Sequence, residues 1–220
     1  MAELESWASW SAALQVADFQ LWGAAVTRAE WMGAVLGLAM VLCNARVSAW
    51  GWPLAIASSL LYALVFFDSH LYGQVALQGV FVLMAGWGLW QWVGRPLKGL
   101  DPAHPDLERH PRAAPAAVRR NALWATLLLW GLIGSLLART TDNPSPYADA
   151  LPTAGSLVAT WLLARKYSDN WLAWLGVNGS AVVLFAQQRL WPTVLLYTLF
   201  ALMSAWGWWM WRRAMRRGSP

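Results

Sequence analysis

The sequence contains few charged residues. Only 12% of its 220 residues are charged, whereas 58% are hydrophobic. A soluble globular domain carries about 25% charged residues. Half that share leaves too few charges to solvate the surface of a chain of this size. We therefore expect lipid to cover most of the protein.

Cysteine and histidine are also scarce. The single cysteine, Cys43, excludes an internal disulfide and a thiolate cluster for a metal. The three histidines, His70, His104 and His110, lie too far apart to suggest a zinc motif. No metal or other cofactor is therefore expected. The N-terminus carries acidic residues instead of the positive segment of a secretion signal, so we expect its first segments to remain in the mature protein.

Long apolar segments and tryptophans, by contrast, are abundant. A membrane-spanning helix needs about 20 mostly apolar residues. Seven segments meet this requirement: about 29–46, 51–68, 71–93, 120–138, 149–166, 170–187 and 190–211. The 19 tryptophans suit a protein with two membrane interfaces, because indole rings prefer the level of the lipid headgroups. The sequence predicts an all-α integral membrane protein with seven transmembrane helices.

The remaining segments are expected to lie outside the hydrocarbon. Residues 1–28 form an N-terminal interfacial segment, with an amphipathic helix predicted over 4–27. Residues 94–119 are rich in proline and charge, which predicts an aqueous loop. The predicted units are then the first three-helix bundle at 29–93, the loop, a linking helix at 120–138 and a second three-helix bundle at 149–213.

The basic residues are distributed unevenly between the two predicted sides. With seven spans, one side holds only Arg28, Arg139 and Arg189. The other side holds the remaining 13 of the 16 Lys and Arg residues. By the positive-inside rule, the N-terminus is outside and the C-terminus is cytoplasmic. Since the charges lie in loops and at the C-terminus, with no basic stripe on a helix, the net charge of +5 does not indicate nucleic-acid binding.

An internal repeat is the most informative pattern. Residues 30–92 align without a gap on 149–211, an offset of 119, with identities at 15 of the 63 positions. Arg46 aligns with Arg165, for example, and Trp52 with Trp171. The matching is densest where Trp87-Gly88-Leu89-Trp90 aligns with Trp206-Gly207-Trp208-Trp209.

The repeat predicts how the helices are arranged. Each copy contains three spans, and one further helix separates the copies, so both copies enter the membrane in the same direction. This is a 3+1+3 architecture of two parallel three-helix bundles joined by a linking helix, as in the SWEET sugar transporters. Two such bundles enclose a central site that rocking can open to one side at a time, which favours transport.

Polar side chains inside the spans are candidates for that site, because a polar group in hydrocarbon is costly. Gln78 lies mid-span and aligns with Tyr197 in the second copy. Asn178 follows Trp174 by four residues, which places an amide and an indole on one helical face. Trp174 can stack on a flat ring while Asn178 bonds a hydroxyl or an amide. The alternative for each is a role in helix packing.

Two further groups are open to a functional or a structural interpretation. Glu30 and Asp149 occupy helix starts on the outer side, where a carboxylate is either a helix cap or a gate. Hydroxyl and amide groups of several spans can add hydrogen bonds to a substrate or bond their own helix backbone. These residues are Ser58, Ser59, Tyr62, Gln74, Thr153, Ser156 and Thr160.

The sequence resembles the Pnu-type vitamin transporters, in particular the nicotinamide riboside transporters called PnuC. Trp50-Gly51-Trp52-Pro53, Gln78 and Trp87-Gly88-Leu89-Trp90-Gln91-Trp92 carry the resemblance in the first half. Asn170-Trp171, Trp174, Asn178, Tyr197 and Trp206-Gly207-Trp208-Trp209 carry it in the second. One departure is Gly51, where Asn170 predicts an asparagine.

The resemblance implies both an activity and a site. The implied activity is facilitated diffusion of an unphosphorylated nucleoside-like vitamin across a bacterial inner membrane, by a homotrimer whose substrate a cytosolic kinase phosphorylates and traps. The resemblance assigns Gln78, Trp174 and Asn178 to the substrate site. The full set of predicted substrate-binding residues adds Tyr197, Trp52 and Tyr62, with Asn170 a possible gate or cap beside Glu30 and Asp149.

Several substrates and two other classes of protein compete with this interpretation. One class is a structural subunit of a larger complex, which would not explain polar residues placed centrally in corresponding helices. The first substrate is nicotinamide riboside; thiamine is also a flat cation, and riboflavin is neutral and larger. A membrane-embedded enzyme would need a convergent set of catalytic groups, and no span contains a histidine pair or two central acids. We therefore predict a transporter and not an enzyme.

Overall fold

The computed structural model describes Leu14 and residues 16–21, 24–68, 72–94, 110–141, 145–187 and 191–217, which are mostly helical. Seven long helices dominate this part of the chain, and all seven segments predicted as apolar helices are helical. They are α2 (Arg28–Ala45), α3 (Gly51–Asp68), α4 (Tyr72–Leu89), α5 (Ala116–Thr140), α6 (Pro146–Ala164), α7 (Asp169–Gln187) and α8 (Trp191–Arg217). A short π-helix, η1 (Trp90–Gly94), extends α4.

Two of the described helices are long and apolar enough to cross a membrane by themselves. They are α5 over Ala116–Thr140 and α8 over Val194–Arg217, with mean hydropathies of 1.6 and 1.3. In their apolar stretches of 18 residues, only 6% of α5 and 17% of α8 are buried. Most of these side chains therefore point outward. A core helix of a soluble protein would show the opposite, whereas a helix surrounded by lipid is expected to look like this.

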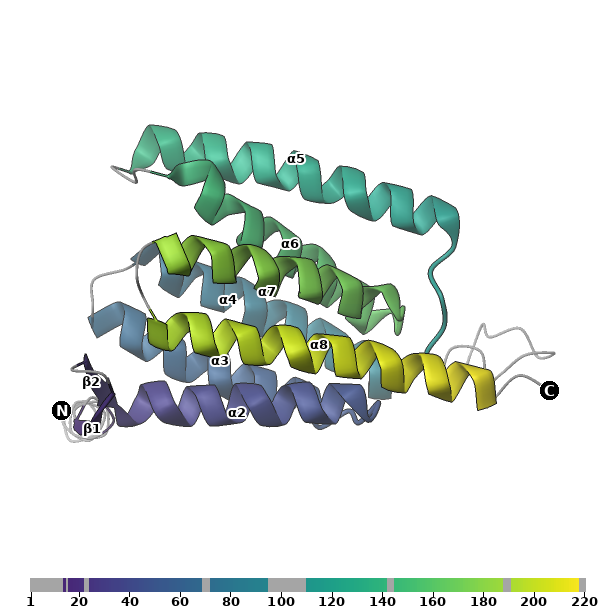
Figure 1. Ribbon diagram of the computed structural model, residues 1–220, viewed down its shortest axis with the longest axis horizontal. Helices are drawn as coiled ribbons and strands as arrows, with labels where there is room; N and C mark the ends of the chain where they lie inside the picture. The colour runs from purple at the N-terminus through teal and green to yellow at the C-terminus, as the bar shows by residue number, and fades with distance from the viewer. Residues whose placement is uncertain are drawn as a thin grey trace.

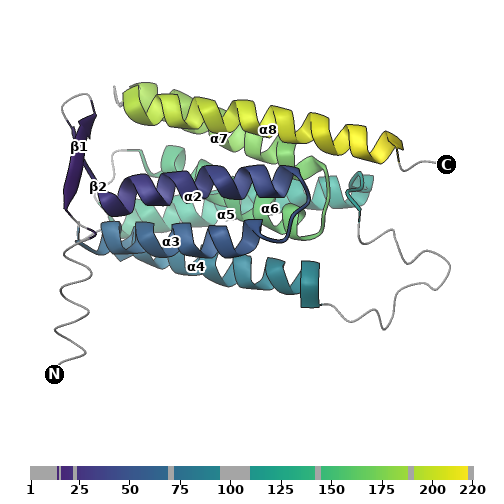
Figure 2. The same ribbon diagram turned by 90° about the horizontal axis from the view of Figure 1, so that it is seen from below.

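Six of the helices form a closed ring. Helix α2 packs against α3 and α8, α4 packs against α3 and α6, and α7 packs against α6 and α8. Helix α5 lies outside this ring and packs on α6 (Figure 1). The β-strands before α2 and the C-terminal end of α8 lie at opposite ends of the helices in both views (Figures 1 and 2).

Contacts within the ring recur at the offset of the sequence repeat. Trp52 and Trp92 meet edge to face with ring centroids 5.6 Å apart, and Trp171 and Trp211 do the same at 5.7 Å. The Trp92 indole N–H donates to the carbonyl oxygen of Ala164 at 3.2 Å, and that of Trp211 donates to the carbonyl oxygen of Ala45 at 3.1 Å. Each half therefore donates one such bond to the other. We call α2–α4 and α6–α8 the two halves of the ring, because these contacts recur at the offset of the sequence repeat.

The turns after α2 and α6 are also built alike. Val47 and Lys166 occupy the same position and both have a left-handed backbone, with φ of 56° and 55°. The amide of Ser48 donates to the carbonyl of Cys43 at 2.9 Å, and the amide of Tyr167 donates to the carbonyl of Leu162 at 3.0 Å. This is the bonding of a Schellman turn, which satisfies carbonyls that a helix end leaves free. These turns set the angle at which α3 and α7 begin.

The end of the 94–119 segment is docked, although the whole segment was predicted to be an aqueous loop. Residues 95–109 lie outside the described part. Arg112 exchanges backbone hydrogen bonds with Lys166 and Ser168 at 3.0 and 2.8 Å, and its guanidinium lies 5.0 Å from the centroid of the Tyr167 ring. Arg119 pairs with Asp169 through atoms 2.6 Å apart. These contacts fix the start of α5 on the α6–α7 turn.

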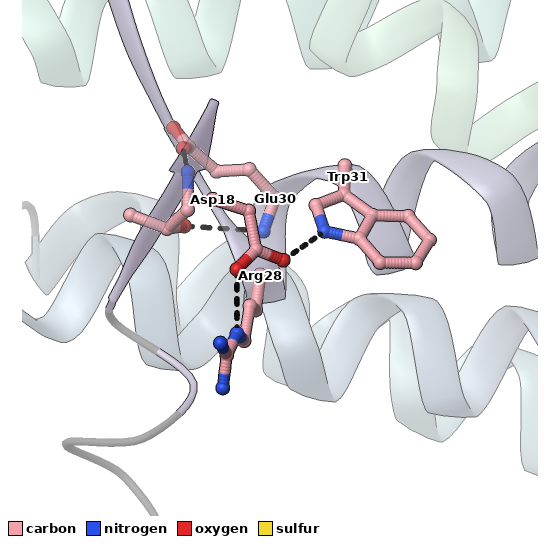
Figure 3. Close-up of polar contacts among 5 residues, drawn as sticks. Asp18, Arg28, Glu30 and Trp31 are labelled. Atoms are coloured by element: carbon pink, nitrogen blue, oxygen red, sulfur yellow. Dashed lines mark hydrogen bonds and ion pairs between the residues drawn. The ribbon is translucent and has the colours of Figure 1, made fainter. Parts of the chain in front are cut away.

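The amphipathic helix predicted over 4–27 is wrong for residues 17–21 and 24–27, and residues 4–13, 15, 22 and 23 lie outside the described part. Strands β1 (Ala17–Leu21) and β2 (Ala24–Thr27) form an antiparallel hairpin instead. The hairpin brings Asp18 to α2, where its carboxylate accepts hydrogen bonds from Arg28 at 2.7 Å and Trp31 at 3.0 Å (Figure 3). A continuous helix rises 1.5 Å per residue and would carry Asp18 away from both partners.

Candidate functional site

A cavity of about 280 Å³ lies inside the ring. All six ring helices contribute to its wall, and α5 contributes none of the described lining residues. The lining residues are Met40, Val41, Asn44, Trp52, Ala55, Ser58, Ser59, Phe81, Ala85, Pro152, Ser156, Thr160, Leu163, Trp171, Trp174, Val177, Asn178, Tyr197, Phe200 and Ser204. The cavity is thus formed by both halves together.

Most of these residues occur as pairs related by the offset of 119. Trp52 pairs with Trp171, and Phe81 pairs with Phe200. Other pairs combine an apolar with a polar residue, so the two walls differ in chemistry. Examples are Ser58 with Val177, Asn44 with Leu163 and Ala85 with Ser204. Because the two halves place different side chains at aligned positions, the cavity can hold one asymmetric ligand.

Aromatic rings provide much of the wall. Six of the lining residues are aromatic: Trp52, Phe81, Trp171, Trp174, Tyr197 and Phe200. Flat apolar or cationic rings bind well in such surroundings, because an aromatic face stacks on them and attracts positive charge.

Several polar groups of the wall are oriented by hydrogen bonds within the protein. The side-chain amide of Asn178, which is 5% exposed, donates from Nδ2 to the hydroxyl of Ser204 at 3.2 Å. Ser204 in turn donates to the carbonyl of Phe200 at 2.8 Å. Ser58 donates to the carbonyl of Gly33, and Thr160 donates to that of Ser156, each at 2.8 Å. Their oxygen atoms can still accept a hydrogen bond from a ligand.

Charge is missing from the wall as far as the structure describes it: none of the described lining residues is acidic, basic or histidine. A phosphate or carboxylate entering this cavity would lose its water without meeting a Lys or an Arg. Such burial of an unpaired charge is very costly. The cavity therefore suits a neutral molecule or a delocalised cation.

The cavity brings together four of the six residues that the sequence predicted as substrate-binding. Trp52, Trp174, Asn178 and Tyr197 line it, whereas Gln78 and Tyr62 are not among its described lining residues. Tyr62 stacks on Phe66 with centroids 6.0 Å apart, and a Cβ at Gly33 would lie 3.1 Å from its ring. Among the additional hydroxyl candidates, Ser58, Ser59, Ser156 and Thr160 line the cavity.

The remaining candidates lie at helix ends or outside the wall. Glu30 forms a capping box at the start of α2: it accepts from the amide of Thr27 at 2.7 Å, while its own amide donates to the Thr27 hydroxyl at 3.3 Å. Asp149 lies in the first turn of α6, where Thr153 donates to its carbonyl at 3.2 Å. Asn170 is fully buried in the first turn of α7. The side chain of Gln74 lies outside the described part.

Sequence reasoning missed Asn44 and Ser204 as residues of the wall. Ser204 aligns with Ala85, and Asn44 aligns with Leu163, so each is a polar residue at a position that is apolar in the other half. That contrast was visible in the repeat and could have identified both.

A second cavity, of about 370 Å³, lies between α5, α6 and α7, outside the ring. Its polar side chains among the described residues are Thr126 and Ser180, which donate to carbonyls of their own helices at 2.9 and 2.8 Å. Because these hydroxyls are used locally, this groove offers little to recognise a polar substrate.

Comparison with known proteins agrees with this geometry. The sequence profile of the family described as "Nicotinamide mononucleotide transporter" matches residues 27–213. The chain belongs to this family. The matched residues include α2 to α7 and most of α8, and leave out most of the β-hairpin.

Two characterised relatives differ in their substrates. The riboflavin/roseoflavin transporter RibM of Streptomyces davaonensis is 28% identical over 207 residues, which cover 92% of this chain and 93% of RibM. The nicotinamide riboside transporter PnuC of Haemophilus influenzae is 24% identical over 206 residues, which cover 90% of this chain and 86% of that protein.

The fold has a solved counterpart as well. A crystal structure of the vitamin B3 transporter PnuC superposes with a TM-score of 0.67 at 22% identity, and covers 86% of this chain and 82% of the other. The family and this structure are transporters and not enzymes, which confirms the predicted class and the resemblance to Pnu-type transporters.

Proposed function

We propose that this chain imports nicotinamide riboside across a bacterial inner membrane by facilitated diffusion. The observation that carries the proposal is the aromatic cavity shared by the two halves of the ring, whose described lining residues carry no charge. Membership of the family supports transport of a nicotinamide-containing compound, and PnuC relatives support the riboside in particular.

The chemistry of nicotinamide riboside suits this wall. Its pyridinium ring is flat and cationic, and an aromatic face attracts such a cation by about 0.5–2 kcal/mol. In this proposal Trp174, four residues before Asn178 on α7, stacks on the ring while Asn178 bonds a hydroxyl, and both residues line the cavity. The mononucleotide carries a phosphate in addition, for which the described wall has no cation. Phosphorylation by a cytosolic kinase would therefore trap the imported riboside.

The proposed mechanism uses the two halves as rocking bundles. In this 3+1+3 arrangement α2–α4 and α6–α8 are parallel bundles and α5 links them across the membrane. The recurrence of the Trp52–Trp92 and Trp171–Trp211 contacts supports their equivalence. Rocking about the shared cavity then opens it to one side at a time. The arginines near the end of α8 favour a cytoplasmic C-terminus, and assembly as a homotrimer completes the proposal.

Riboflavin is a second candidate because RibM shows the higher identity of the two relatives described. Its ribityl chain also carries hydroxyls, and its flat ring also suits aromatic walls. Riboflavin is neutral and has a larger ring system, so it gains less from cation–π attraction and needs more space than the riboside.

Calorimetric titration of the purified protein distinguishes these candidates. Nicotinamide riboside, its mononucleotide, riboflavin and thiamine are titrated separately. Tightest binding is expected for the riboside, with no detectable binding of the mononucleotide. If riboflavin or thiamine bound more tightly than the riboside, that compound would be the substrate instead. Failure of all four to bind would overturn the proposed function.

A further inference from the structure

The two turns at one end of the cavity differ in where an asparagine is placed. The second half has Leu163 at the end of α6 and Asn170 at the start of α7. At the equivalent positions, 119 residues earlier, the first half has Asn44 and Gly51. Each half thus has one asparagine at this pair of positions. It is at the helix end in the first half and at the start of the next helix in the second.

The side chain of Asn44 occupies the space that the exchange leaves empty. A Cβ built on Gly51 would overlap the side-chain oxygen of Asn44 and lie 2.8 Å from its Cγ. The absence of a side chain at Gly51 is therefore what allows Asn44 its position. This accounts for the departure from the expected asparagine at position 51.

The exchange puts the asparagine on the one of the two residues that lines the cavity. Asn170 donates from Nδ2 to the carbonyl of Tyr167 at 2.6 Å and is not among the described lining residues. Asn44, by contrast, lines the cavity. The first half therefore presents an amide where the second half presents the side chain of Leu163.

Polar atoms at this end of the cavity lack partners in the described part of the protein. The side-chain oxygen of Asn44 accepts no hydrogen bond there, and the residue is only 3% exposed. The indole N–H groups of Trp52 and Trp171 also have none, with these residues 2% and 3% exposed. The lining residues thus offer one free acceptor, on Asn44, and two free donors, on Trp52 and Trp171. A ligand group that both donates and accepts hydrogen bonds would satisfy them.

We propose that Asn44 is a substrate-binding residue that determines specificity for a hydroxylated ligand. A small adjustment of these side chains lets its amide and the two indole N–H groups bond the hydroxyls of a ribosyl or ribityl group, because a hydroxyl is both donor and acceptor. The flat ring of the ligand then lies toward Trp174. This assignment rests on the proposed transport of a ribose-bearing vitamin and adds the residue that reads the sugar.

The double variant N44L/G51N tests this role. It copies the arrangement of the second half into the first, so the packing is kept while the amide moves from the cavity to the turn. Calorimetry compares wild type and variant with nicotinamide riboside, and with 1-methylnicotinamide, which keeps the cationic ring but has no ribose. We expect affinity for the riboside to fall about tenfold, as for loss of a hydrogen bond to a buried partner, and affinity for 1-methylnicotinamide to stay unchanged.

Each other outcome has a definite meaning. Wild-type affinity for the riboside in the double variant would show that Asn44 only fills space beside Gly51, and would overturn the assignment. An equal loss for both ligands would also overturn it, because the amide would then contact the ring. If N44L/G51N does not fold, N44A is used instead, because it removes the amide without adding bulk. N44A must then lose affinity for the riboside and keep its affinity for 1-methylnicotinamide. If wild type binds neither the riboside nor riboflavin, the proposed function itself is wrong.

Discussion

Trp174 and Asn178 lie one helical turn apart and give one wall of the cavity a stacking surface and a hydrogen-bonding group. Their spacing on α7 puts an indole and an amide side by side in the cavity. The hydrogen bond from Asn178 to Ser204 on α8 holds the amide in one orientation. Because Nδ2 is engaged there, the side-chain oxygen is the atom that can accept from a ligand hydroxyl.

Replacing Asn178 by alanine is expected to weaken binding of nicotinamide riboside about tenfold or more, because the amide is lost and Ser204 loses its donor. Trp174→Ala is expected to weaken it further by removing the stacking face. Ser180→Ala is the matched control on the same helix, since the Ser180 hydroxyl donates only to the carbonyl of Val177. Calorimetry and size-exclusion chromatography are the measurements. Unchanged affinity in both α7 variants would remove these residues from the site.

At the scale of elements, two glycines determine how closely α3 meets α4 and α7 meets α8. A Cβ at Gly88 would lie 2.5 Å from atoms of the Trp52 ring, and one at Gly207 would lie 2.7 Å from the Trp171 ring. The indoles can therefore pack against bare backbone. This close approach explains why the Trp-Gly pairs at 87–88 and 206–207 occur in both halves of the sequence.

Gly88→Ala is expected to lower stability by about 1–3 kcal/mol, as overpacking does in a filled core. Gly86→Ala is the matched control two residues earlier on α4, because a Cβ there meets nothing within 4 Å. Alanine favours a helix over glycine, so the control is expected to be neutral or slightly stabilising. Thermal unfolding of the detergent-solubilised protein measures both variants, and equal melting temperatures would contradict the packing argument.

The hairpin contact with α2 should depend on pH. Hydrogen bonds from Arg28 and then Trp31 lower the pKa of Asp18 below its usual value of 3.8. A lowered pKa means that the contact stabilises the folded hairpin above that value and is lost as pH falls through the lower pKa. The rate of amide hydrogen exchange at residues 24–30 is measured and corrected for its intrinsic pH dependence. This rate is expected to rise only in strong acid, where Asp18 becomes protonated. Asp18→Asn should show the faster exchange already at neutral pH, and a variant that exchanges like wild type would contradict this contact.

At the scale of the whole molecule, the ring explains why a cavity exists at all. Each half packs its own three helices and meets the other half along two seams, α4 with α6 and α2 with α8. Small residues such as Gly37 and Ala85 lie near the cavity wall and leave its centre unfilled. An odd number of long helices then places the β-hairpin and the end of α8 at opposite ends (Figure 1).

Cysteine accessibility tests the proposed orientation. In a Cys43→Ala background, a cysteine at the exposed position Thr141, after α5, is expected to react with an impermeant maleimide added to intact cells. A cysteine at the exposed position Arg216, near the end of α8, should react only after the cells are opened. Both variants should react fully in detergent. The reverse pattern would invert the topology, and labelling of both from one side would rule out a ring that crosses the membrane.

The sequence by itself determined the class of protein, the seven apolar helices and the internal repeat. These are local or periodic properties: few charges, runs of apolar residues, and pairs such as Trp52 and Trp171 at a fixed offset. It also identified Trp174 and Asn178, because helical spacing alone places them on one face. It also placed Glu30 at a helix start, and the capping box of Thr27 and Glu30 forms there within a single turn.

Only the tertiary structure decided the rest. Asp18 reaches α2 through a hairpin that composition alone did not distinguish from an amphipathic helix. Gln78 and Tyr197 are equivalent in sequence, yet only Tyr197 is among the described residues of the wall. Asn44 has its place because Gly51, seven residues later, leaves room across the turn. Such assignments depend on which atoms of different helices meet, and the packing of the helices around the cavity fixes those contacts.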